Sequence, residues 1–148
     1  MRRRVAVFAV LTGLMMTVGL TTALVQERAG DVTVTVTYTG KGKVDDTHEI
    51  WVFLFDTPNV GRESQPLATQ AVKKSGGTAT FKNISQDPVY VLFAFDETGN
   101  YDGTAGPPPP GTPIGMYSTD GKAPAPVKPG TGAKVKATFD DTRRMGQQ

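Results

Sequence analysis

The chain has 148 residues, enough for one domain, and its 17 glycines and 11 prolines indicate many turns. Its net charge of +2 includes three arginines near the start, Arg2 to Arg4, and removing these three positive charges leaves −1. A near-neutral remainder excludes the clustered basic face that nucleic-acid binding needs, and the absence of cysteine excludes disulfide bonds.

The first 23 residues have the pattern of a signal peptide. Arg2 to Arg4 form a positive start, residues 5–25 carry no charge, and small residues end the segment at Ala23. We predict cleavage after Ala23, which makes Leu24 the first mature residue. The other interpretation is an uncleaved anchor, because about 20 uncharged residues can span a bilayer. An exported protein without disulfides favours a bacterial periplasmic or extracellular location, with membrane contact only through a retained leader.

After a short linker, residues 24–30, the chain has the pattern of successive strands. From Val32 to Thr39 apolar residues alternate with threonine, which predicts a strand with one buried face. Residues 49–56 and 88–96 are apolar at successive positions and predict central strands buried on both faces. Weaker strands are predicted at 66–72, 78–84, 114–118 and 133–140, with inward-facing Ala79, Phe81, Val135, Ala137 and Phe139. Residues 31–140 are therefore predicted to form an all-β domain, a two-sheet antiparallel sandwich of six to seven strands.

A proline-rich loop, residues 104–132, interrupts the series of strands. Pro107 to Pro110 favour polyproline II and cannot join a sheet ladder. The loop is either a ligand for an aromatic-lined groove or, as we favour, a stiff surface excursion. Because residues 50–55 are apolar on both faces, one face needs a cover, and we predict that this loop supplies it. Residues 141–148 are predicted to be a flexible tail.

Motifs of enzyme chemistry are missing from the sequence. The single histidine, His48, is followed by Glu49 but not by a second histidine at position 52, so the zinc-protease motif is absent. No serine lies in a G-x-S-x-G turn, and no glycine-rich phosphate loop precedes a helix. We therefore predict a non-catalytic module with a binding or structural role. The alternative is a small hydrolase that uses rim carboxylates, for example Asp56 and Asp96 if their strands end at one rim.

The loop after residue 95 offers oxygen donors at every second position. These donors have the spacing of a calcium loop and are Asp96, Thr98, Asn100 and Asp102. Tyr101 replaces the glycine of position six and Pro107 the bidentate glutamate of position twelve, so the expected affinity is at best about 10⁻⁴–10⁻³ M. The alternative is an Asx-type turn, in which Asp96 and Asn100 bond to nearby backbone amides. No cofactor other than this calcium ion is expected.

Short motifs along residues 31–140 carry a family resemblance. They comprise a Phe-x-x-[IL] strand, a tyrosine in a central strand, an acidic loop and a later Gly-x-Tyr-Ser, here Phe81, Ile84, Tyr90, Asp96, Asn100, Asp102 and residues 115–118. This pattern resembles the transthyretin-like and carboxypeptidase-regulatory-like sandwich domains, closest to small exported bacterial domains of unknown function. The resemblance implies a prealbumin-like fold and a non-catalytic role, with a protein or polysaccharide as the partner.

The chain departs from the family pattern at three positions of its loops. Thr98 replaces an asparagine, Tyr101 replaces a glycine, and Asp87 precedes Pro88 where a glycine-containing turn is usual. The transthyretin-like hydrolases of purine catabolism use several histidines and a C-terminal Tyr-Arg-Gly-Ser, and this chain has neither. Their activity is therefore not implied.

Overall fold

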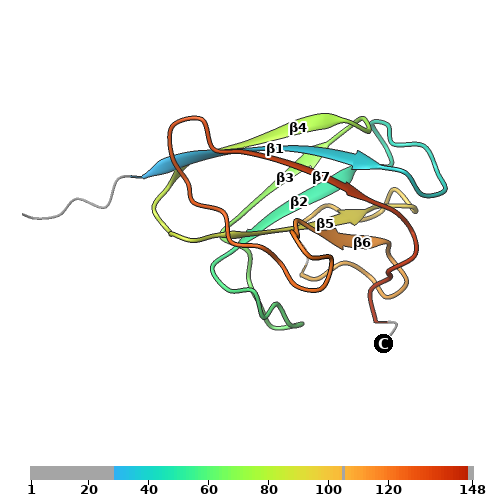
Figure 1. The fold of residues 1–148 in the computed structure, drawn as a ribbon. Coiled ribbons are helices and arrows are strands. Elements are labelled where there is room, and N and C mark those ends of the chain that lie inside the picture. The colour runs from blue at the N-terminus through green and yellow to red at the C-terminus, as the bar shows by residue number, and fades with distance from the viewer. Residues whose placement is uncertain (1–28, 105, 147–148) are drawn as a thin grey trace, which may run out of the picture.

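The structure, a computed structural model, describes residues 29–104 and 106–146. Within this part of the chain the regular elements are seven strands and no helix (Figure 1). Their bounds are β1 (Gly30–Tyr38), β2 (Ile50–Phe55), β3 (Ala68–Val72), β4 (Gly77–Ile84), β5 (Tyr90–Phe95), β6 (Ile114–Met116) and β7 (Lys134–Phe139). The signal segment predicted at 1–23 lies outside the described residues, and the described ones contain no helix able to cross a membrane.

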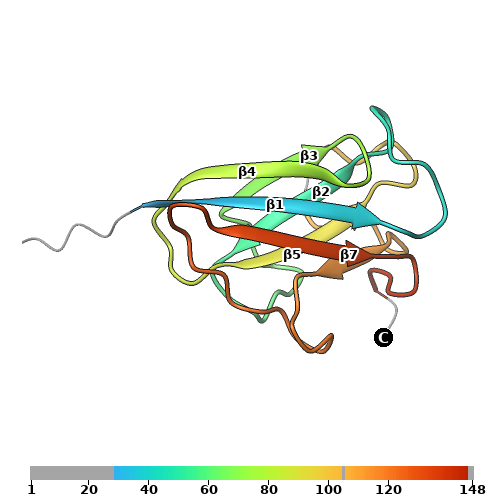
Figure 2. The ribbon, with the colours of Figure 1, turned by 45° about the horizontal axis from the view of Figure 1, so that its top comes forward.

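The strands form two sheets that lie one over the other (Figure 2). One sheet has the order β4-β1-β7 and the other the order β3-β2-β5-β6. All neighbours are antiparallel except β1 and β7, which run parallel, with Val34 opposite Val135. The prediction of a wholly antiparallel arrangement is therefore wrong for this pair. Parallel neighbours need a long connection, and β1 and β7 lie at opposite ends of the domain sequence.

The main apolar core lies between the two sheets. From the three-stranded sheet, Val32, Val34 and Val36 are fully buried, as their alternation with threonine predicted. They share this core with Ile50, Val52 and Leu54, the alternate residues of β2 that face the three-stranded sheet. Burial of these side chains on folding is the main favourable contribution to stability, at about 25 cal/mol per Å² of apolar surface.

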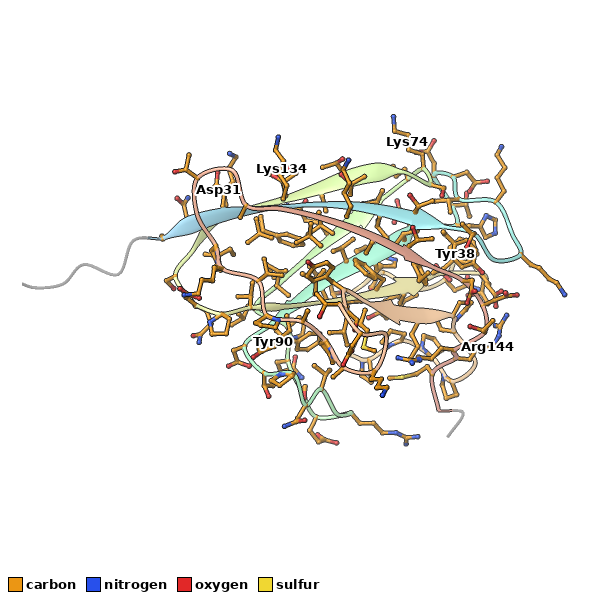
Figure 3. All side chains as sticks on the ribbon, viewed as in Figure 1. Asp31, Tyr38, Lys74, Tyr90, Lys134 and Arg144 are labelled. Atoms are coloured by element: carbon orange, nitrogen blue, oxygen red, sulfur yellow. The ribbon has the colours of Figure 1, made fainter. Side chains whose placement is uncertain are left out.

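An aromatic group closes one end of this core. The ring of Tyr38 lies 4.3 Å from that of Phe95 and 5.0 Å from that of Phe139, between centroids (Figure 3). Burial raises the pKa of Tyr38 to about 12, and the nearby negative charge of Asp141 adds to the shift. The neutral hydroxyl donates a 3.0 Å hydrogen bond to the carbonyl of Lys41 and so ties the end of β1 to the following loop.

Specific contacts join the sheets at their two sides. The Gln70 amide of β3 donates to the Thr80 carbonyl (2.6 Å) and accepts from the Thr80 N–H (2.9 Å), which satisfies the free edge of β4. On the other side, Gly115 of β6 lies so close to Phe139 of β7 that an added Cβ would come within 2.5 Å of the phenylalanine Cβ. Only glycine allows this approach, which gives a physical reason for the glycine of the Gly-x-Tyr-Ser motif.

A second apolar cluster covers the outer face of the four-stranded sheet. Phe53 and Phe55 are each only 6% exposed, and Val60 and Tyr101 pack against them from two loops. In Figure 1 the chain between β2 and β3 lies on the side of this sheet that faces away from β1, β4 and β7. The predicted cover was the proline-rich loop, residues 104–132, and the structure confirms this only in part. The cover, however, comes from residues 56–67 and 96–113, and the proline-rich part contributes only one edge.

The C-terminal segment, predicted to be a flexible tail, makes hydrogen bonds to the loop before β6. The Met145 amide donates to the Thr112 carbonyl (2.9 Å), and the Gly111 amide donates back to the Met145 carbonyl (2.8 Å). The Arg144 guanidinium (Figure 3) binds both carboxylate oxygens of Glu97 at 2.7 and 3.2 Å. These bonds fix residues 143–145 against the 96–113 loop, because a bidentate arginine–carboxylate pair constrains both position and orientation. These contacts give part of the segment fixed partners, and the flexibility of residues 141–148 stays a prediction.

Candidate ligand-binding cavity

A cavity of about 700 Å³ lies on the outer face of the four-stranded sheet in the described chain. This volume lies within the range of about 300–1,000 Å³ that is typical of small-molecule sites. All four strands of the sheet contribute to its floor, and the loops 56–67 and 96–113 form its walls with the end of the chain. The apolar side chains of its lining are those of Phe53, Phe55, Val60, Pro66, Leu92, Tyr101, Pro107, Pro108, Ile114 and Met145.

The alternation of β2 explains why an apolar floor exists outside the core. Successive side chains of a strand point to opposite faces, so a strand that is apolar at every position supplies two apolar surfaces. Ile50, Val52 and Leu54 use one surface for the core, and Phe53 and Phe55 present the other to the loops. The loops cover most of these two rings, and the cavity lies beside them between the loops and the sheet.

Tyr101 fixes one wall of the cavity. Its ring lies 6.4 Å from that of Phe53 and meets Trp51 edge-on at 5.9 Å. Its hydroxyl donates a 2.7 Å hydrogen bond to the carbonyl of Gly106, at the start of the proline run. Burial raises the pKa of Tyr101, with a smaller contribution from Asp102, so the hydroxyl keeps the proton that this bond requires at neutral pH.

Gly103 brings the same loop down onto the sheet. It has a φ of +73°, a region that glycine occupies without strain. A Cβ at this position would overlap the indole of Trp51, at 2.2 Å from its Cε3 atom. The loop backbone therefore rests directly on Trp51, and no larger residue fits there without displacing the wall.

The polar groups of the cavity are few, and only one of them is charged. Within the described chain the uncharged polar side chains of the lining are those of Ser64, Gln65, Thr69 and Thr104, and the charged one is that of Arg62. Arg62 is exposed in the loop between β2 and β3. No ion pair joins it to any residue that the structure describes. A cavity with an apolar body and a single cation at its rim can bind an apolar ligand and orient it by one polar contact.

A second, smaller hollow lies where β6 meets the end of β7. Its volume is about 260 Å³, below the range typical of ligand sites. Its lining includes the polar Ser118, Asp140, Thr142 and Arg143. Because this hollow is smaller than a typical ligand site, the cavity on the four-stranded sheet is the stronger candidate.

The carboxylate of Asp96, the first residue predicted to bind calcium, is satisfied by its own loop. Asp96 is 5% exposed. Its Oδ1 accepts hydrogen bonds from the amides of Thr98 (3.1 Å) and Gly99 (2.9 Å) and from the Thr98 hydroxyl (2.9 Å), and its Oδ2 accepts from the Tyr101 amide (2.9 Å). For Asp96 this is the Asx-type turn of the alternative interpretation.

Of the other three predicted calcium ligands, Thr98 contacts Asp96, as a hydrogen-bond donor to its carboxylate. Asn100 is exposed. The Asp102 carboxylate accepts from the amide and hydroxyl of Thr104, at 2.9 and 3.0 Å. The described chain also has no group of three or more His, Asp or Glu side chains placed to hold a metal ion. The turn therefore explains the recurring oxygen donors without an ion, and calcium binding stays a prediction for experiment.

Asp56 and Asp96 do not lie at one rim of the sheet. β2 and β5 are antiparallel, with Ile50 opposite Phe95 and Phe55 opposite Tyr90. Asp56 and Asp96 each follow the last residue of their strand and so lie at opposite ends of the pair. At about 3.3 Å per residue the separation is roughly 20 Å, whereas paired carboxylates of glycosidases lie about 5–9.5 Å apart. The hydrolase alternative loses the pair that motivated it.

His48 caps a turn with Asp45. The Asp45 carboxylate accepts from the amides of Thr47 (3.0 Å) and His48 (2.9 Å), and its Oδ1 lies 3.0 Å from the His48 Nδ1. These bonds, with that from the His48 amide the largest, lower the pKa of Asp45 to about 2. His48 lies in the loop before β2, outside the cavity lining.

Comparison with known proteins gives no relative for this chain: no family model, no curated protein and no solved structure matches it. The candidate site therefore rests on the geometry alone. Sequence reasoning had found the two-faced strand β2 and its need for a cover. It had missed Arg62, because a single arginine in an irregular loop belongs to no motif.

Proposed function

We propose that this chain is an exported, non-catalytic module of a bacterial cell envelope that binds a ligand in the cavity on its four-stranded sheet. The single observation that carries the proposal is a cavity of about 700 Å³ outside the main core, lined by apolar side chains together with polar groups. A monomer gains stability by filling such space, so a cavity of ligand size with fixed walls favours binding over a purely structural role.

The finer fold assignment belongs to this proposal. Two face-to-face sheets of three and four strands are compatible with a prealbumin-like sandwich of the transthyretin-like kind. The partner expected from the sequence was a protein or a polysaccharide. The cavity favours a smaller and more apolar ligand, because a sugar chain needs many hydrogen-bonding side chains and this lining offers few.

Filling the cavity tests the proposal. Replacing Leu92 by tryptophan places a large ring in the cavity, whereas Leu67→Trp adds the same ring at a position that is 46% exposed and outside the lining. Thermal unfolding is then measured with indole, decanol and decanoate for the parent and for both variants. A ligand at about 100 times its Kd stabilises the folded state by about 2.7 kcal/mol and raises the Tm by on the order of 10 °C.

We expect the parent and Leu67→Trp to gain the same Tm shift with at least one of these compounds, and Leu92→Trp to gain none. An equal shift in all three proteins would place the binding outside the cavity. The absence of a shift in the parent with every compound would count against a binding role for this cavity.

A further inference from the structure

The positive charge in the cavity lining indicates the chemical class of the ligand. This inference rests on the proposed function. Arg62 is the one charged side chain of the lining within the described chain, and no carboxylate is part of that lining. Since Arg62 also has no ion-pair partner among the described residues, its charge is available to a ligand. A guanidinium presents a planar fork of donors that matches a carboxylate or a phosphate.

The rest of the cavity suits an apolar body. Phe53, Phe55 and Leu92 form the floor, and Pro107 and Pro108 form an edge that lacks backbone N–H donors. The one phenolic hydroxyl of the wall, that of Tyr101, is already bonded to the Gly106 carbonyl. The apolar surface of this floor and edge favours an apolar body of the ligand, because burial of apolar area stabilises the complex.

We propose that the ligand is a small amphipathic anion, with an apolar chain over Phe53 and Phe55 and one acidic head group at Arg62. The chemistry is that of a fatty acid, whose single carboxylate and unbranched chain match one cation and one apolar floor. The head lies at the rim because Arg62 is exposed, and the chain extends inward between the two loops.

Calorimetric titration of the full chain with decanoate and with decanol tests the class of ligand. Decanoate and decanol share the chain and differ in charge. We expect decanoate to bind more tightly than decanol, and its affinity to fall as salt screens the head group. Along octanoate, decanoate and dodecanoate the affinity is expected to rise about fourfold per methylene, because each buried CH₂ contributes about 0.8 kcal/mol.

Two arginine variants separate the contact at Arg62 from general charge. Arg62→Gln is expected to weaken decanoate by about three- to tenfold and leave decanol unchanged. The matched control, Arg143→Gln, removes the same charge from an exposed position outside the cavity and is expected to bind both compounds as the parent does. All variants keep the same leader, so any binding by that segment is common to them.

Equal affinities for decanoate and decanol, with Arg62→Gln unchanged, would overturn the anion assignment and leave the cavity as the binding site. Equal weakening by Arg62→Gln and Arg143→Gln would overturn it too, because the effect would then come from net charge. If neither compound binds, the anion assignment is wrong. Whether the cavity binds any ligand is then decided separately, by the Tm shifts that indole causes in the parent and in Leu92→Trp.

Discussion

Asp96 is a buried carboxylate whose bonding partners all come from the loop that follows it. Four donors from Thr98, Gly99 and Tyr101 surround its two oxygens. The turn holds the backbone of Tyr101 through the hydrogen bond from the Tyr101 amide. The position of this backbone places the Tyr101 ring at the cavity wall. One side chain therefore links the end of a core strand, β5, to the candidate site.

Removing this carboxylate is expected to destabilise the protein. Asp96→Ala leaves the amides of Thr98, Gly99 and Tyr101 without their acceptor, at a cost of about 2–3 kcal/mol in the free energy of unfolding. The matched control is Asp120→Ala, since the exposed Asp120 carboxylate accepts from the Lys122 and Ala123 amides in a similar turn. Urea unfolding should show the larger loss for Asp96→Ala; equal losses would contradict the role given to the buried turn.

The same variant tests calcium. Because both oxygens of Asp96 already accept hydrogen bonds, we expect thermal unfolding of the parent to be the same in millimolar calcium and in chelator. A calcium-dependent rise in Tm that Asp96→Ala abolishes would instead support the calcium loop predicted from Asp96, Thr98, Asn100 and Asp102, since a ligand of the folded state stabilises it by mass action.

At the scale of elements, the 96–113 loop is held against the four-stranded sheet at Gly103. Gly103 and Gly106 both have positive φ, +73° and +94°. An added Cβ meets Trp51 at the first position and open space at the second. Alanine substitutions at the two positions share the backbone strain, but only the one at Gly103 meets Trp51. Comparing the two variants therefore separates the effect of strain from the effect of the contact with the indole.

Gly103→Ala is expected to cost about 2–4 kcal/mol, from a left-handed alanine and from overpacking against Trp51. Gly106→Ala carries only the backbone strain, about 1–2 kcal/mol. Unfolding followed by the fluorescence of the single tryptophan measures both the loss of stability and the change around the indole. If the two variants behave alike, the loop does not rest on Trp51 as described.

Strand faces could be predicted from sequence, whereas strand neighbours could not. Alternation has a period of two residues and is local, so the buried face of Val32, Val34 and Val36 follows from the sequence directly. Which strands pair depends on contacts between distant segments. The parallel pairing of β1 with β7 and the opposite directions of β2 and β5 leave no local pattern in the sequence. The antiparallel prediction was therefore wrong for β1 and β7, and the condition for the hydrolase alternative, one rim for Asp56 and Asp96, is not met.

At the scale of the whole molecule, the cavity could be predicted only in part. The apolar outer face of β2 pointed to a surface that needs a cover. The depth of the cavity depends on how loops 56–67 and 96–113 and residues 143–145 pack together, and no single stretch of sequence contains that information. Arg62 becomes a candidate contact for a ligand only because its loop places it in the lining of the cavity.

Export is the remaining part of the proposal that belongs to the whole chain. The positive start and uncharged stretch of residues 1–25 lead us to expect a mature N-terminus at Leu24. Mass spectrometry of the cell-envelope fraction measures this directly. A full-length species embedded in the membrane would show that the leader is an anchor instead.

Methyl NMR during an indole titration tests the central claim, that the outer face of the four-stranded sheet binds an apolar ligand, most directly. Indole carries no charge, so the result is independent of Arg62. We predict that methyl signals of Val60, Leu92 and Ile114, which surround the cavity, shift together and saturate. Those of Val34 and Val52, buried between the sheets, should stay in place. Shifts at Val34 and Val52, or none at the three cavity residues, would contradict the account.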